Sequence, residues 1–394
     1  MIPLPDDIDI RPAPGGSMPR QRLFLGAWGG DAWGDVLPTM LVVEAIGTND
    51  TADVVYAIGH SPWVPNSPQS TRARGRFEGH ELLVDFGTAR TRWRLLADGR
   101  LFGRYEGGGM VSYCVLRRIE GGIDAIRAAA ADTGARCHGR AIDIPMTDPD
   151  SGAPIGLKAT YTPSPQIQCP PLVLINHGSA DGTPREEIAS RVIRHGQLSR
   201  FFVGLGWAVL EPMRRGRGGS GGRYVEQDFD HAPTVDSSEA ELAAGLADLR
   251  AAMDFVRSWP EVDGRRVLLA GQSRGGFLAT MYEAAHPGEA LGVLDFAGGW
   301  WSEAWERDHL GGGWQTGRFA TAGATSRALS LWLYGTIDDY YGPDIVESWH
   351  RAYAAAGART ALRLFETPKD SGHHIVAMPG FWEADATAFV ASLS

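Results

Sequence analysis

A serine between two glycines stands where one expected strand runs directly into a helix. A Val-Leu-Leu-Ala run ends at residue 270, an Ala-rich helical pattern covers 274–286, and Gly271-Gln272-Ser273-Arg274-Gly275 joins them. Such a sharp turn holds the serine in a strained conformation that exposes its hydroxyl, and it leaves room only for glycine two positions to either side. With 51 glycines a chance match is plausible, but a chance match in this strand-to-helix context is much less so. The pattern predicts Ser273 as a nucleophile.

Two later loops contain the partners that a serine nucleophile requires. A serine hydroxyl needs a base to take its proton, and a carboxylate must orient that base. One expected strand is followed by the adjacent carboxylates Asp338 and Asp339, and the next by the adjacent imidazoles His373 and His374. Parallel strands end at the same edge of a sheet, so these groups are expected near Ser273, in the chain order Ser, Asp, His.

The segment beyond residue 135 alternates between strand and helix patterns. A hairpin around Asp148-Pro149-Asp150-Ser151-Gly152 precedes repeated βα units, which predicts a doubly wound, mostly parallel α/β sheet. The expected strands are 139–146, 156–162, 171–176, 207–212, 265–270, 291–297, 328–334 and 359–365. The expected helices are 185–203, 236–258, 274–286, 344–356 and 380–392.

The segment 22–118 has a different pattern, in which short strands are separated by Gly, Asp, Asn or Pro. Eight such strands predict a small all-β, barrel-like domain, and Asp98-Gly99 is a favourable hairpin turn between two of them. The expected strands are 22–28, 40–46, 52–59, 72–78, 80–86, 90–97, 100–106 and 110–118. We therefore expect an N-terminal extension, a β domain, a linker with a helix, and a catalytic domain, at 1–21, 22–118, 119–135 and 136–394.

The turn around Ser273 and the ordered partners resemble the α/β-hydrolase superfamily, in particular its bacterial dienelactone-hydrolase-like and prolyl-oligopeptidase-like branches. The resemblance covers residues 135–394. It implies that the acid closes a Tyr-Gly-x-x-Asp segment, which selects Asp338, and that the base follows a glycine, which selects His373. It also implies an oxyanion hole, for which the backbone N–H groups of Ser179 and Arg274 are the candidates. The β domain is similar to lipocalin-like barrels through Gly26-Ala27-Trp28.

Two further segments, one rich in glycine and one rich in tryptophan, could belong to the same site. Residues 213–222 are similar to the Arg-Gly-x-Gly-x-Ser stretch of the superfamily, and they lack the Gly-Lys-Ser/Thr ending of a phosphate loop. A structural turn near the pocket mouth is the preferred interpretation. The segment 299–320 lies where the superfamily often inserts a lid, and its tryptophans either line a substrate pocket or serve as ordinary packing. They are Trp300, Trp301, Trp305 and Trp314.

The composition excludes several kinds of partner. A net charge of −10 argues against nucleic acid, and no run of 18 apolar residues is present, so no membrane insertion is expected. The first 20 residues do not have the pattern of a signal peptide, which predicts a soluble, cytoplasmic protein, or a periplasmic or secreted one if a signal peptide has been removed. The three cysteines predict no disulfide framework. We expect no metal and no cofactor. The sequence leaves open whether the protein forms a homo-oligomer.

Three functions follow from these patterns. The first is a serine hydrolase that cleaves a small ester or lactone through an acyl-enzyme intermediate. The second is a peptidase or amidase, although such relatives carry a long N-terminal propeller and residues 22–118 show no internal repeat. The third is a binding protein whose barrel captures an apolar ligand, which the presence of both the serine and the histidine disfavours.

Overall fold

The computed structural model describes residues 1–32, 37–60, 67–96, 99–107, 110–131, 139–164, 167–179, 185–226, 233–300, 313–367 and 372–393. The chain divides into two compact units. We call Met1–Arg136 with Ala377–Gly380 the N-terminal unit, and Cys137–Val376 with Phe381–Ser394 the C-terminal unit. None of the described helices combines the length and the apolar character that crossing a membrane requires.

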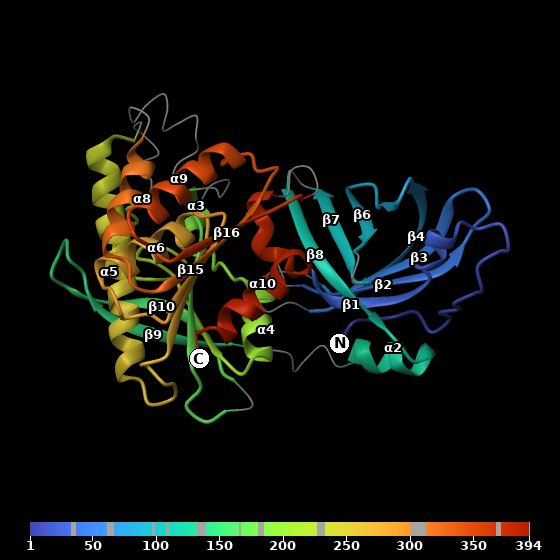
Figure 1. Ribbon diagram of the computed structural model, residues 1–394. Helices are drawn as coiled ribbons and strands as arrows, with labels where there is room; N and C mark the ends of the chain where they lie inside the picture. Colours follow the sequence, from blue (N-terminus) through green and yellow to red (C-terminus); the bar gives the residue numbers. More distant parts are fainter. Residues whose placement is uncertain are drawn as a thin grey trace. The chain divides into compact units, whose positions relative to one another are not determined.

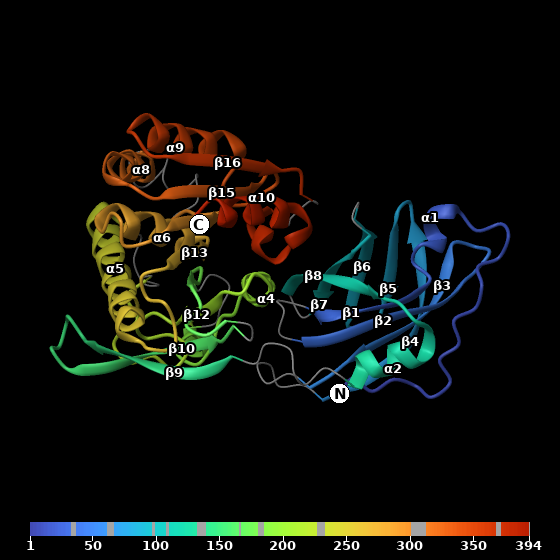
Figure 2. The ribbon, with the colours of Figure 1, turned by 60° about the horizontal axis from the view of Figure 1, so that its bottom comes forward.

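The N-terminal unit is an eight-stranded antiparallel barrel, as expected. Consecutive strands pair with each other, and β1 closes the barrel by pairing with β8 (Figures 1 and 2). The strands are β1 Gly26–Ala32, β2 Leu37–Ile46, β3 Thr51–Ile58, β4 Gln69–Glu78, β5 Glu81–Asp85, β6 Ala89–Leu95, β7 Leu101–Gly107 and β8 Met110–Ile119.

Apolar side chains from all eight strands form one buried cluster inside the barrel. Trp28 and Trp93 are its largest members, and both are almost fully buried. The Trp28 Nε1–H donates to the carbonyl of Phe24 at 2.9 Å, and the guanidinium of Arg118 lies 5.0 Å from the centre of the Trp28 ring. Because alternate residues of each strand point inward, this cluster is the core that stabilises the barrel.

The start of the barrel differs from the expected strand 22–28. Residues Pro19–Arg22 form a helical turn, α1, with proline at its first position, and the strand begins only at Gly26. Proline favours the first turn of a helix because its φ is already helical and its missing N–H has no partner there. Helix α2, Gly122–Ala131, packs with Ile2 against the outer faces of the first three strands.

The C-terminal unit contains a second eight-stranded sheet, in the order β16-β15-β14-β13-β11-β12-β10-β9. Its strands β11 to β16 run parallel to their neighbours, while β10 pairs antiparallel with β9 and with β12. This mostly parallel sheet is the α/β-hydrolase fold that the resemblance implies. The strands are β9 Arg140–Thr147, β10 Pro154–Thr162, β11 Leu172–Asn176, β12 Ala208–Pro212, β13 Val267–Gln272, β14 Gly292–Phe296, β15 Leu329–Gly335 and β16 Thr360–Phe365.

Helices cover both faces of this sheet (Figure 1). On strand β14, Val293 belongs to a buried apolar cluster that includes residues of helices α5 and α6. Phe296, three residues later and on the opposite face of the sheet, packs against Trp382 of helix α10. Phe319 links α6, α8 and α9 on the first face, and Phe201 of α4 meets Trp382 on the second. The helices are α4 Gly196–Gly204, α5 Val235–Ser258, α6 Arg274–Ala285, α8 Trp314–Thr325, α9 Pro343–Ala355 and α10 Pro379–Ala391.

One expected helix of this unit is wrong. The single helix 185–203 is replaced by the short helix α3, Arg185–Ile188, and by α4, which begins at Gly196. Between them the backbone N–H of His195 donates to the buried carboxylate of Glu211 at 2.7 Å, a tertiary contact that competes with helix formation. The last part of the expected lid, from Trp314 on, forms the beginning of helix α8, and residues 301–312 lie outside the described residues, so the lid stays a prediction.

Candidate active site

The turn at Ser273 has the strained geometry that its neighbours predict. Ser273 has φ 55° and ψ −126°, a region that residues with a side chain rarely adopt. Its N–H donates to the carbonyl of Phe296 at 2.9 Å, and its own carbonyl accepts from Gly276 at 2.9 Å. A Cβ on Gly275 would lie 2.1 Å from the carbonyl oxygen of Asn176, so only glycine fits there.

An acid and an imidazole are paired in the loops that follow β15 and β16. His373 Nδ1 lies 3.1 Å from Asp338 Oδ2. The Asp338 side chain is fully buried, and its Oδ1 accepts the backbone N–H groups of Tyr340 at 2.8 Å and Tyr341 at 3.2 Å. His374 is exposed, as is Asp339. Of the two candidate acids and the two candidate bases, the structure therefore pairs Asp338 with His373.

Several contacts bring this pair to the serine. The Gln272 side-chain amide, one residue before Ser273, donates to the carbonyl of His373 at 3.1 Å. The ring of Tyr341 lies 5.4 Å from the imidazole of His373. Gly299, which lies against the Tyr341 ring, donates its N–H to the carbonyl of Ser273 at 3.2 Å. The three residues predicted to act together, Ser273, Asp338 and His373, thus lie at one edge of the sheet.

The His-Gly loop after strand β11 lies directly against the nucleophile candidate. A Cβ on Gly178 would be 3.4 Å from the Cβ of Ser273 and 2.5 Å from Oε1 of Gln272. Ser179 follows at once, and Arg274 is the first residue of helix α6, whose first N–H groups have no partner within the helix. Ser179 and Arg274 thus belong to the two segments that meet beside Ser273, and their role as oxyanion donors stays a prediction.

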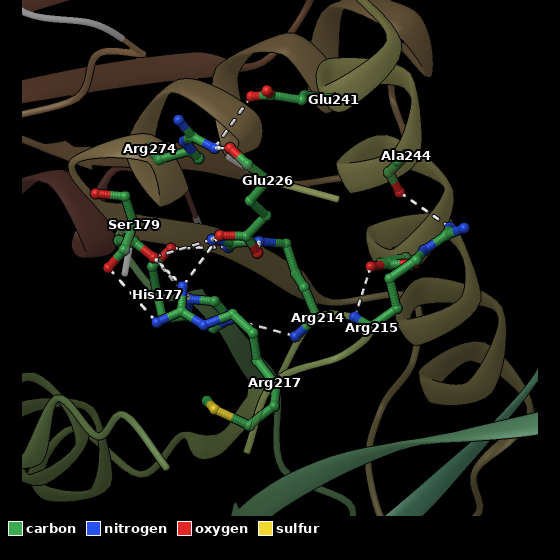
Figure 3. Close-up of polar contacts among 12 residues, drawn as sticks. His177, Ser179, Arg214, Arg215, Arg217, Glu226, Glu241, Ala244 and Arg274 are labelled. Atoms are coloured by element: carbon green, nitrogen blue, oxygen red, sulfur yellow. Dashed lines mark hydrogen bonds and ion pairs between the residues drawn. The ribbon is translucent and has the colours of Figure 1, made fainter. Parts of the chain in front are cut away.

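Two buried arginines hold the His-Gly loop in place (Figure 3). Arg214 donates to the carbonyls of His177 at 2.8 Å and Gly178 at 2.9 Å, and Arg217 donates to the carbonyl of Gly178 at 3.0 Å. Both guanidinium groups also bind Glu226 Oε2, each at 3.0 Å. The glycine-rich segment 213–222 is thus a structural turn, and its arginines fix the backbone beside the candidate nucleophile.

The charges in this cluster are fixed by burial and by each other. Burial alone would raise the pKa of Glu226, but Arg214 and Arg217 attract its charge and hold that pKa below its usual value. For His177, burial and the same two arginines lower the pKa well below 6.5, so the imidazole is neutral. The hydrogen bonds assign its proton to Nδ1, which faces the Gly178 carbonyl, while Nε2 accepts the Arg214 N–H.

Replacing Glu226 by glutamine is expected to destabilise the protein strongly. The substitution leaves two buried guanidinium groups facing an uncharged amide, which costs about 3–5 kcal/mol when a buried ion pair is broken. Urea denaturation of the variant measures the loss. Glu261→Gln is the matched control, since Glu261 pairs with Arg140 on the exposed surface, where such pairs contribute at most about 1 kcal/mol. Equal losses in the two variants would contradict the structural role of Glu226.

The two tryptophans of the pocket prediction that the structure describes pack around helix α6. Trp300 is buried, with its ring centre 5.5 Å from that of Phe277, and the guanidinium of Arg274 lies 4.3 Å from the ring. Trp314 stacks on the same phenylalanine at 5.9 Å. Their role in a substrate pocket stays a prediction. The other two candidates, Trp301 and Trp305, lie outside the described residues.

Sequence reasoning missed three residues that bear on the site. Glu226 has no motif around it, and its importance depends on arginines that reach it only in the fold. Tyr341 could have been noticed, because it lies three residues after Asp338 in the same loop. Asp295, on β14, is a buried carboxyl group next to the turn at Ser273. Burial raises its pKa to about 8, although Tyr334 donates to it at 3.2 Å, so it is largely neutral at pH 7.

Over the ranges that the structure describes, no group of three His, Cys, Asp or Glu side chains is arranged to hold a metal ion.

The sequence matches no protein-family model and no curated protein. The fold is similar to those of solved hydrolases. An esterase from Pyrococcus furiosus is 14% identical over 64% of this chain and 90% of its own, with a TM-score of 0.45. A puromycin-hydrolyzing peptidase from Mycobacterium tuberculosis is 14% identical over 93% of this chain and 69% of its own, with a TM-score of 0.47. At these values neither activity carries over to this chain.

Proposed function

We propose that this protein is a serine hydrolase that cleaves a carboxylic ester or lactone through an acyl-enzyme intermediate. The observation that carries the proposal is the strained Ser273 at a strand-to-helix turn, at the same sheet edge as the hydrogen-bonded pair of His373 and Asp338. A strained, glycine-flanked serine is costly to fold, and such strain concentrates where a side chain must be presented for chemistry.

In the proposed reaction, His373 takes the proton of Ser273 as its Oγ attacks the substrate carbonyl. Asp338 accepts the Nδ1–H of His373 and stabilises the imidazolium that forms. The backbone N–H groups of Ser179 and Arg274 stabilise the oxyanion, each by about 3 kcal/mol. His373 then protonates the leaving alcohol, and in the second half it activates the water that releases the acid.

The surroundings of the loops support a substrate that is at least partly apolar. Ile337 and Tyr340, which flank Asp338 and its neighbour, are exposed apolar side chains, and the Tyr340 ring lies 4.4 Å from the ring of His373. An exposed apolar group beside a candidate base favours contact with an apolar part of a ligand. The cluster of Arg214, Arg217 and Glu226 adds rigidity behind the proposed oxyanion donors.

An ester is favoured over a peptide because the N-terminal unit is a closed barrel with a packed interior. Strands β1 to β8 form this single barrel and not the repeated blades of a propeller that the peptidase alternative implies. The peptidase or amidase alternative predicts a different result in the following experiment.

The choice between ester and amide can be tested with matched substrates. We expect the kcat/KM for p-nitrophenyl butyrate to exceed that for butyryl p-nitroanilide by on the order of 100-fold or more, since the two differ only in the leaving group. The Ser273→Ala variant gives the background rate for each substrate. An anilide hydrolysed as fast as the ester, and only by the unmodified protein, would favour the peptidase or amidase alternative instead.

A further inference from the structure

The side chain of Gln272 joins two parts of the candidate site that are far apart in the sequence. Gln272 is the last residue of strand β13, directly before Ser273, and it is half-buried. Its side-chain amide donates to the backbone carbonyl of His373 at 3.1 Å. We call the segment that contains Gly372 and His373 the base loop. The mechanism proposed above uses the serine and the histidine but assigns no task to the glutamine between them.

The two ends of this amide contact different loops. A carbonyl oxygen only accepts hydrogen bonds, so it is the NH2 group of the amide that contacts His373. The amide oxygen lies against the His-Gly loop, because a Cβ on Gly178 would be 2.5 Å from Gln272 Oε1. One side chain therefore contacts both the base loop and the loop that contains the proposed oxyanion donor Ser179.

The base loop is also fastened to the loop that holds the acid. The N–H of Gly372 donates to the carbonyl of Ile337 at 2.7 Å, and His373 Nδ1 lies 3.1 Å from Asp338 Oδ2. A Cβ on Gly372 would lie 2.0 Å from the carbonyl oxygen of Ile337, so the two loops pack tightly. These contacts fix the base relative to the acid, whereas the Gln272 amide fixes it relative to the strand that presents the serine.

We propose that Gln272 is a positioning residue, whose side-chain amide holds the base loop where His373 can take the proton of Ser273. This inference rests on the proposed function. Proton transfer needs the imidazole within hydrogen-bond reach of the serine Oγ, and a displacement of about 1 Å can lower the rate of a chemical step on the order of 100-fold. Gln272 acts through His373 and transfers no proton itself.

The substitution Gln272→Met keeps the length of the side chain but removes the N–H donor. We expect kcat for p-nitrophenyl butyrate to fall about 10- to 100-fold while KM changes less than about threefold, because the base and not the substrate is displaced. Rates are expressed per active site, titrated to completion with a fluorophosphonate, so a partly unfolded variant still gives an answer. A rise in KM at unchanged kcat would refute the positioning role.

A second variant separates the hydrogen bond from the shape of the side chain. Gln272→Glu keeps the shape and an oxygen for the Gly178 side, but at pH 8 its carboxylate faces the carbonyl of His373, and both groups only accept hydrogen bonds. We expect kcat to fall at least as far as in Gln272→Met. If Gln272→Glu kept the kcat of the unmodified protein, the hydrogen bond would have no role in positioning the base.

The matched control is Gln21→Met. Gln21 is buried in the N-terminal unit, and its side-chain amide donates to Asp50 Oδ1 at 2.8 Å, so this variant also loses one glutamine donor. It should keep the kcat of the unmodified protein. If Gln272→Met also keeps that kcat while Ser273→Ala is inactive, the role of Gln272 is refuted and the proposed hydrolase stands. If the unmodified protein shows neither turnover nor labelling at Ser273, both fail together.

Discussion

Replacing His373 by alanine is expected to lower kcat for ester hydrolysis by roughly 10⁶-fold, because nucleophile and base act as one unit and the loss of either removes the mechanism. Replacing His374 should change kcat less than about threefold, since it is not the imidazole that Asp338 binds. Steady-state kinetics with p-nitrophenyl butyrate measure both effects. The two adjacent histidines control for each other, because either substitution removes one imidazole from the same short helix, Gly372–Ala377.

The reverse result would be informative. If His374→Ala abolished turnover and His373→Ala did not, the assignment of the base would be wrong, together with the role of Asp338 that depends on it.

Replacing Asp338 by asparagine is expected to lower kcat about 10⁴-fold, while Asp339→Asn should stay within about twofold. An amide at position 338 can still accept the two backbone N–H groups, but it no longer stabilises the imidazolium and can impose the wrong tautomer on His373. Asp339 is exposed and lies one residue further on. The same kinetic assay applies, with the midpoint of urea denaturation to show that each variant is folded.

A large loss in Asp339→Asn, with Asp338→Asn close to the unmodified protein, would contradict the pairing seen in the structure. Asp339, the other candidate acid of this loop, would then be assigned to orient the base.

Much of the fold could be predicted because its signals are local. The alternation of strand and helix patterns predicted the sheet that supports Ser273, and the glycines around the serine anticipated its backbone strain. The Gly, Asp, Asn and Pro residues between short segments predicted the eight barrel strands, with the first displaced because Pro19 begins a helical turn. The break between α3 and α4 is not a local feature, since His195 and Arg194 reach the buried carboxylate of Glu211 only through tertiary packing.

The site could be predicted less completely than the fold. Chain order predicted the two loops that hold the acid and the base, and the resemblance to α/β-hydrolases implied Asp338 and His373, which the structure pairs. The arginines at 214 and 217 were expected in a turn, but their burial depends on Glu226, a residue without any motif. The hydrogen bond between the Gln272 side chain and the carbonyl of His373 joins two residues that are 101 positions apart in the sequence. Such contacts follow from packing, which a pattern of residue types does not contain.

The most direct test of the proposed mechanism is covalent labelling with a fluorophosphonate probe, followed by mass spectrometry of the intact and digested protein. The account predicts one adduct, on Ser273, which is absent in Ser273→Ala, together with loss of p-nitrophenyl butyrate turnover in proportion to labelling. No adduct on the unmodified protein, or equal labelling of Ser273→Ala, would contradict it.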